Sequence, residues 1–200
     1  MTRRLAAPLL IASLLAACGG GGDNPFGNPP TIENPLGTGG RKLSFVYFQK
    51  CVNPVFLKLL AINQNGQVSS NTCAGSGCHD NTSGTGGAFR VLPAAAAVDL
   101  ANAANTPEVV RESDMYKNFY SSQGEAIPGD PLASRLVNKP LLRNVLHGGG
   151  LIFEGTGDEN LKLLEYWISR PMPQGQDEFS SAANTMFSNG DPATGSCNTL

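Results

Sequence analysis

The apolar positions along this chain predict short helices separated by polar, glycine-rich loops. Residues 43–62 are strongly apolar, and Asn53 and Pro54 within them are residue types that cap and start a helical turn. Residues 93–105 begin with proline and are rich in alanine, which favours a helix. In residues 158–168 the leucine, tryptophan and isoleucine positions repeat with a helical period, after an aspartate placed to cap the helix.

Three further segments begin with proline in the first helical turn, where its missing N–H group is not needed. They start at Thr106, Asp130 and Pro140. Convincing strand alternation is absent, although residues 89–92 fit a brief pairing. We therefore predict a mainly α, loop-rich domain, with a long loop over residues 63–88. A domain with so little regular core commonly needs a disulfide or a cofactor for stability.

The first eighteen residues have the order of a bacterial export signal. Arg3 and Arg4 come first, an apolar run over residues 5–15 follows, and small residues lead to Cys18. The run is too short to be a stable membrane span. The ending Leu-Ala-Ala-Cys resembles a lipobox, which implies cleavage after residue 17 and a lipid on Cys18. An ordinary cleaved signal is the alternative, since a cysteine can stand there by chance.

Composition and charge restrict the compartment and the partners. Residues 18–42 are dominated by Gly, Pro and Asn, so we expect a tether that holds the domain away from a lipid surface, on the outer membrane facing the periplasm or the cell surface. Loss of residues 1–17 changes the formal charge from −2 to −4, because it removes two arginines and no acid. No Lys/Arg cluster suits nucleic acid. No catalytic set is visible, so we do not expect an enzyme.

The most informative motif runs from Thr72 to Asp80 and reads TCAGSGCHD. Cys73 and Cys78 are separated by four residues, and His79 follows directly. Covalent haem normally sits on C-x-x-C-H, which is two residues shorter. The motif is therefore a lengthened haem site, a small disulfide loop, or part of a metal site.

The cysteine count permits more than one of these interpretations. Each of the five cysteines needs an assignment, because unpaired thiols are unusual in an oxidising compartment. With lipid on Cys18 and haem on the motif, Cys51 and Cys197 remain for a disulfide that ties a C-terminal extension, residues 171–200, back to the domain. A disulfide within the motif would balance the count equally well. The chain would then be a haem-free, disulfide-stabilised lipoprotein with a scaffold or binding role.

The histidines favour haem. The chain has two histidines, and His79 lies directly after Cys78, where the proximal haem ligand must be. His147 precedes three glycines, which let the backbone approach a flat ligand, so we expect it to be the distal ligand. Met172 is its rival and Met115 is a distant third. Two imidazoles on the iron would suit single-electron transfer and not substrate binding.

Two further expectations concern the same site. Arg135 and Arg90 are candidates to pair with the haem propionates, although a solvent-facing position is the default expectation for an arginine. Zinc held by the two cysteines of the motif and the two histidines is a rival, but the adjacent side chains of Cys78 and His79 point in different directions and suit tetrahedral zinc poorly.

Several short motifs surround the site. They are an apolar V-x-P-x-x-L segment, the C-x4-C-H motif, a glycine segment, a PGDP-x-x-S-x-L cap and a final L-x-x-W-I helix. Their residues are Val52, Pro54, Leu57, Cys73, Cys78, His79, Gly86, Gly87, Phe89, Val91, Pro128, Gly129, Asp130, Pro131, Ser134, Leu136, Leu164, Trp167 and Ile168. With these motifs the chain resembles the planctomycete-type cytochrome c family, over residues 54–168.

The resemblance implies a small, cytochrome c-like helical domain over residues 43–170, wrapped around one covalent haem c. It also implies an electron carrier that exchanges electrons with redox partner proteins of the cell envelope. The family commonly has M-P-P in the distal loop, where this chain has His147 and three glycines. Histidine in place of methionine should lower the reduction potential, because thioether ligation raises it.

Overall fold

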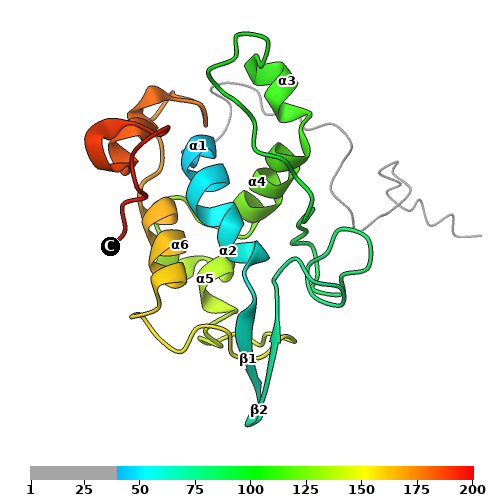
Figure 1. Cartoon of the computed structure of the whole chain (residues 1–200). Helices are drawn as coiled ribbons and strands as arrows, with labels where there is room; N and C mark the ends of the chain where they lie inside the picture. Colours follow the sequence, from blue (N-terminus) through cyan, green and yellow to red (C-terminus); the bar gives the residue numbers. More distant parts are fainter. Residues whose placement is uncertain (1–39) are drawn as a thin grey trace, which may run out of the picture.

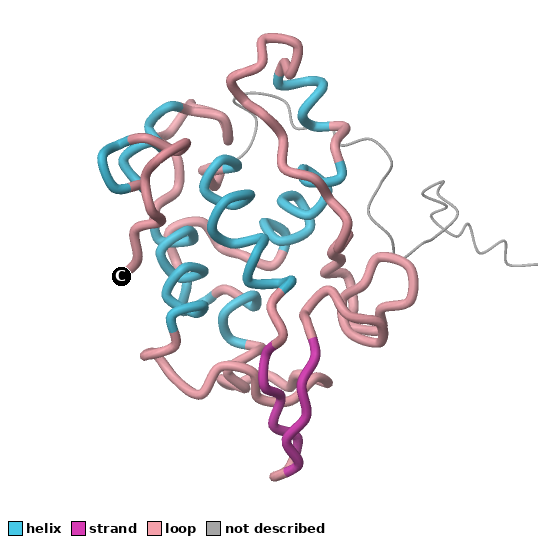
Figure 2. The backbone as a smooth tube through the Cα atoms, viewed as in Figure 1, coloured by secondary structure: helices cyan, strands magenta, loops and turns pink. Residues whose placement is uncertain are grey.

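The computed structural model describes residues 40–200 (Figure 1), so the signal, Cys18 and the tether up to residue 39 lie outside the described residues. The regular elements are short and are joined by long loops (Figure 2). They are α1 (Phe45–Tyr47), the π-helical η1 (Phe48–Val52), α2 (Asn53–Leu57), β1 (Leu60–Gln64), β2 (Gln67–Asn71), α3 (Pro107–Arg111), α4 (Asp114–Gly124), η2 (Pro131–Ala133), α5 (Arg135–Asn138), α6 (Glu159–Ser169), η3 (Ser181–Met186) and η4 (Ser188–Gly190).

The predicted fold class, a mainly α and cytochrome c-like helical domain, is wrong. The described residues form six short α-helices together with a two-stranded antiparallel sheet. The sheet is a hairpin that projects from the helical body (Figure 1). Three segments account for the difference, and each has a local physical cause.

The first segment is the hairpin itself, where the sequence predicts a helix end and a loop. Gln64 pairs with Gln67, which leaves Asn65 and Gly66 as a two-residue turn. Both turn residues have left-handed backbone angles, with φ of 52° and 85°. Asn-Gly is the pair that such a tight hairpin turn favours, because both positions need positive φ. The dipeptide was therefore a hairpin signal within the predicted loop.

The second segment is the alanine-rich stretch 93–105, which is not helical. The side chain of Gln49 bonds both the N–H and the C=O of Val98, at 3.0 and 3.1 Å. The carboxylate of Asp99 and the amide oxygen of Asn102 accept from backbone N–H groups two residues further on. Side chains thus take the backbone groups that a helix would use, and they override the helix propensity of alanine.

The third segment follows Pro140, where a helix is predicted and an irregular loop is present. The carbonyl oxygen of Pro140 accepts from the N–H of Ile152 at 2.8 Å, so it is not the acceptor of a first helical turn. Leu142 and Asn144 have φ of 51° and 56°, which no α-helix contains. This loop leads directly to His147.

Other helices agree with the sequence prediction. The carboxylate of Asp158 caps α6 by accepting from the N–H groups of Asn160 and Leu161. Near the N-terminal end, α1, η1 and α2 follow one another directly. As predicted, α2 begins at Asn53 with Pro54 in its first turn, but Asn53 is itself helical and its side chain does not cap the helix. Pro54 has no N–H to donate to the preceding turn, which fits the wider π-helical register just before it.

The core is aromatic and lies between the first helical segments, α4 and α6. Phe48 packs against Phe119 and Trp167, with ring centroids 5.5 and 5.4 Å apart. The C-terminal residues 171–200 contribute buried side chains to the same cluster. The expected disulfide between Cys51 and Cys197 is present. No helix within residues 40–200 is long and apolar enough to cross a membrane.

Candidate functional site

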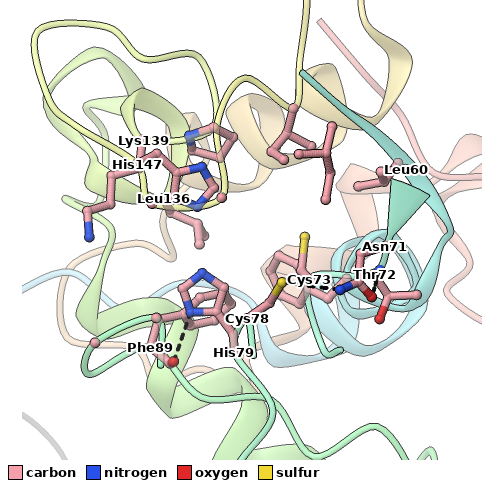
Figure 3. Close-up of a pocket in the computed structure, with 18 of the residues that line it drawn as sticks. Leu60, Asn71, Thr72, Cys73, Cys78, His79, Phe89, Leu136, Lys139 and His147 are labelled. Atoms are coloured by element: carbon pink, nitrogen blue, oxygen red, sulfur yellow. Dashed lines mark hydrogen bonds between the residues drawn. The ribbon is translucent and has the colours of Figure 1, made fainter. Parts of the chain in front are cut away.

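A cavity of about 570 Å³ brings together both cysteines of the motif and both histidines (Figure 3). This volume is in the range of cavities that hold cofactors and small ligands. The hairpin, the motif loop, α5 and the loop after α5 supply its walls. Among the lining residues are Phe56, Leu60, Ile62, Asn71, Cys73, Cys78, His79, Gly86, Phe89, Arg135, Leu136, Lys139, His147, Gly148, Gly149 and Ile152.

Tight turns fold the motif so that both cysteines reach this cavity. The N–H of Cys78 donates to the carbonyl of Gly75 at 3.0 Å, and the N–H of His79 donates to the carbonyl of Cys73 at 2.9 Å. Gly77, within the four-residue spacer, has a left-handed φ of 79°, which a glycine adopts without strain. The longer spacer is therefore closed by a turn. Figure 3 shows the two sulfur atoms together at one side of the cavity.

The amide of Asn71 lies beside the second cysteine. Its Nδ2 donates to Sγ of Cys78 at 3.5 Å, and its Oδ1 accepts from the N–H of Thr72 at 2.8 Å. Because β2 ends at Asn71, the hairpin places this amide directly at the motif. The side chain of Cys78 is thereby oriented toward the cavity.

The segment that follows Gly86 and Gly87 holds the ring of His79. The carbonyl oxygen of Phe89 lies 3.1 Å from Nδ1 of His79, and the two rings are 4.6 Å apart. The carbonyl of His79 accepts from the N–H of Val91 at 2.8 Å, within a short parallel bridge of Asp80 with Val91. The brief pairing expected at residues 89–92 is thus present. A side chain at Gly86 would collide with the imidazole.

His147 is held in the same way on the opposite wall. Its Nδ1 lies 2.8 Å from the carbonyl oxygen of Gly150, and its own carbonyl accepts from the N–H of Gly150 at 2.9 Å. Gly150 has a φ of 79°, so the turn that closes on the ring needs glycine here.

The two imidazoles face each other across the cavity. Their ring centroids are 6.1 Å apart and their planes differ by 9°. Figure 3 shows a nitrogen of each ring directed into the gap between them. A metal–imidazole bond is about 2 Å long and the nitrogen lies about 1 Å from the ring centre, so two imidazoles on opposite sides of one iron have centres about 6 Å apart. The observed separation fits this arrangement.

The protonation state of His79 suits metal ligation, whereas the Cys73 thiol stays protonated. Burial lowers the pKa of His79 to about 4, so its ring is neutral at pH 7. Burial, followed by the neighbouring Cys78, raises the pKa of the Cys73 thiol to about 12. A backbone carbonyl can only accept a hydrogen bond, so the neutral ring of His79 has its proton on Nδ1 and a free lone pair on Nε2.

Cationic side chains lie on α5 and directly after it, at the cavity wall. Arg135 and Lys139, one helical turn apart, both line the cavity. Arg135 also pairs with Glu125 at 3.4 Å. Lys139 extends on the side away from the sulfurs (Figure 3). Arg90, the other candidate for the propionates, is buried and is not among the lining residues in the described part of the chain.

The other predicted candidates lie elsewhere. Met172 and Met115 are buried in the core, and neither lines this cavity. Trp167 is also in the core, where Nε1 donates to the carbonyl of Ser44 at 2.9 Å. For the zinc alternative, residues 40–200 contain no group of three or more His, Cys, Asp or Glu side chains arranged to hold one metal ion.

Sequence reasoning missed Asn71, Gln64 and Lys139. Lys139 had a usable signal, its spacing of four residues from Arg135 just after a predicted helix. Asn71 and Gln64 had none once the hairpin was read as a loop.

No family model, no curated protein and no solved structure matches this chain. The resemblance to a cytochrome c family therefore stays a prediction. The functional proposal rests on the cavity and its own side chains.

Proposed function

We propose that the chain is a c-type haem protein that transfers single electrons in the cell envelope. The observation that carries this proposal is the pair of parallel imidazoles, 6.1 Å apart, across a cavity that both cysteines also line. In a bis-histidine c-type haem site, two imidazoles hold the iron and two cysteines attach the porphyrin covalently. The side chains of this cavity would supply both sets of groups.

Each residue has a distinct role in this proposal. Cys73 and Cys78 would form thioethers with the haem vinyl groups, His79 would be the proximal ligand and His147 the distal one. When bound, the haem iron supplies one-electron oxidation and reduction. Lys139 lies away from the sulfurs, which suits the carboxylate edge of a haem, since this edge is opposite the vinyl edge.

The walls favour electron transfer over catalysis. Phe56, Phe89, Leu136 and Ile152 give part of the cavity an apolar lining. If His79 and His147 both hold the iron, no coordination position would be left for a substrate. We therefore infer an electron carrier. The partners would be redox proteins, reached from a lipid anchor on Cys18 through the tether.

Intact mass and spectroscopy test the haem. The full chain, made in a bacterial host with c-type cytochrome maturation, should retain a haem absorption band after denaturation and carry the mass of one haem. The Cys73→Ala/Cys78→Ala variant should lose both. A wild-type chain that is exported and folded but carries no macrocycle would contradict the proposal and favour the haem-free lipoprotein.

Ligand variants test the axial pair. His147→Ala should open one position, so that the reduced protein binds carbon monoxide readily, while Met172→Leu should leave the spectrum unchanged. If the His147→Ala spectrum matched the wild type, bis-histidine ligation would be refuted.

A further inference from the structure

The β1–β2 hairpin contributes little to the core. Along both strands, Ile62 is the one buried residue, and Val68 is 73 % exposed. A two-stranded hairpin is at best marginally stable by itself in water. Its position therefore depends on its contacts with the rest of the chain. Hydrogen bonds join it to residues 148–151, in the loop that follows His147.

Backbone pairing joins β1 to the loop that follows His147. The N–H of Asn63 donates to the carbonyl of Leu151, and the N–H of Leu151 donates to the carbonyl of Asn63, both at 2.9 Å. One residue along, Nε2 of Gln64 donates to the carbonyl of Gly148 at 2.8 Å. The hairpin thus holds residues 148–151 at two points.

Gly150 lies between the hairpin and the histidine ring. A Cβ atom at Gly150 would lie 2.5 Å from the carbonyl oxygen of Asn63 and 2.6 Å from Cγ of Gln64. The carbonyl of the same glycine is the partner of Nδ1 of His147. A displacement of Gly150 relative to the hairpin therefore changes the direction in which the imidazole points.

Within the loop, the hydrogen bonds that hold the ring and the carbonyl of His147 are made to Gly150. Leu142 has a left-handed φ of 51°, a conformation that is unfavourable for an ordinary L-residue. Leu146, directly before the histidine, is 91 % exposed. The contacts with Asn63 and Gln64 add a support from outside the loop on this side of the cavity.

We propose that the hairpin positions the distal ligand and that Gln64 is the positioning residue. Its hydrogen bond to the carbonyl of Gly148, together with the Asn63–Leu151 pair, keeps His147 aimed across the cavity. This inference rests on the proposed function, because it concerns the axial ligand of the same site. The same hairpin also leads, through Asn71, into the motif that contains His79.

Three variants separate positioning from general stability. Gln64→Ala removes the donor, Gln64→Lys keeps a donor at the same place, and Gln67→Ala alters the exposed cross-strand neighbour as the matched control. Carbon monoxide association with the reduced full chain reports how often His147 leaves the iron. We expect Gln64→Ala to accelerate association about three- to fivefold, the factor that one ordinary hydrogen bond supplies, with Gln64→Lys and Gln67→Ala close to wild type. Equal rates in all four proteins would overturn the proposal.

Hydrogen exchange provides a readout that does not depend on haem. In the purified chain, the backbone N–H groups of residues 150 and 151 should exchange faster in Gln64→Ala than in Gln67→Ala, while those of α6 stay unchanged. Gly150→Ala should have a larger effect, with Gly155→Ala as its control, since a Cβ there meets no atom within 4 Å. If the wild type carries no haem, the proposed function fails. Faster exchange in residues 150–151 then still supports the hairpin as the support of this loop, and unchanged exchange contradicts it.

Discussion

At the scale of single residues, each imidazole of the cavity is fixed by one carbonyl oxygen. Phe89 supplies it for His79 and Gly150 supplies it for His147. Both contacts are made to Nδ1, so Nε2 of each ring is the nitrogen left to face the cavity. Such outer contacts set the orientation and the basicity of a histidine ligand. The glycines next to these contacts are required for space, which makes them the sharpest targets for mutation.

Gly86→Ala should impair haem binding on the His79 side of the cavity. The added methyl group would overlap the imidazole of His79 and lie 2.8 Å from the carbonyl oxygen of Cys78. We expect less haem per chain and a broadened spectrum, measured as the ratio of haem to protein absorbance. Gly157→Ala is the control, because a methyl group there meets no atom within 4 Å. Normal haem content in Gly86→Ala would show that the His79 side tolerates displacement.

The sequence identifies residues that carry chemistry better than residues that support them. Cys73, Cys78 and His79 stand in one motif, and His147 is singled out because the chain has no third histidine. The structure places all four around one cavity. Gln64 supports this cavity from a hairpin whose contacts with residues 148–151 span more than eighty positions, and no local pattern encodes such a contact.

At the scale of elements, short helices are joined to one another by buried polar contacts. Glu178, from the C-terminal region, is fully buried. Its Oε1 lies 2.9 Å from Nε of Arg111 at the end of α3 and accepts from the Tyr116 hydroxyl of α4 at 2.6 Å. Its carbonyl oxygen accepts from the N–H of Phe45, the first residue of α1. One residue thus connects three elements.

Glu178→Gln should therefore destabilise the chain strongly. The change leaves the guanidinium of Arg111, whose side chain is 13 % exposed, without its charge partner, and breaking a buried pair costs about 3 kcal/mol. Glu159→Gln is the matched control, since the pair of Glu159 with Lys162 is exposed and is worth about 0.5 kcal/mol or less. Chemical denaturation followed by circular dichroism measures both. Equal unfolding free energies for the two variants would contradict this assignment.

Elements were predictable where local signals agree with tertiary contacts. In α6 the apolar period and the Asp158 cap specify the same helix, and it forms. In residues 93–105 alanine favours a helix, but Gln49, far away in the sequence, binds the backbone of Val98, and turns with irregular backbone result. Helix propensity is a weak preference that such contacts outweigh.

At the scale of the whole molecule, the C-terminal residues contribute to the aromatic core and not to the cavity. The C-terminal residues 171–200 add Met186 and Phe187 to the core. Nζ of Lys50 donates to the carbonyl oxygens of Pro192, Ala193 and Gly195 beside the disulfide. None of these C-terminal groups lines the cavity within the described residues. Stability and ligand geometry should therefore respond to different mutations.

Removal of the disulfide tests this separation. Cys51 and Cys197 are 146 residues apart, and closing a loop of that length stabilises a chain by about 5 kcal/mol in the entropy model. The Cys51→Ala/Cys197→Ala variant should lose a large part of this free energy in guanidinium unfolding and become insensitive to reducing agents. Its haem spectrum and carbon monoxide binding should remain those of the wild type, because the bond lies outside the cavity wall. The contrary result would be a change in axial ligation at a denaturant concentration where the variant is still folded. It would show that the Cys51–Cys197 disulfide and the cavity belong to one cooperative unit.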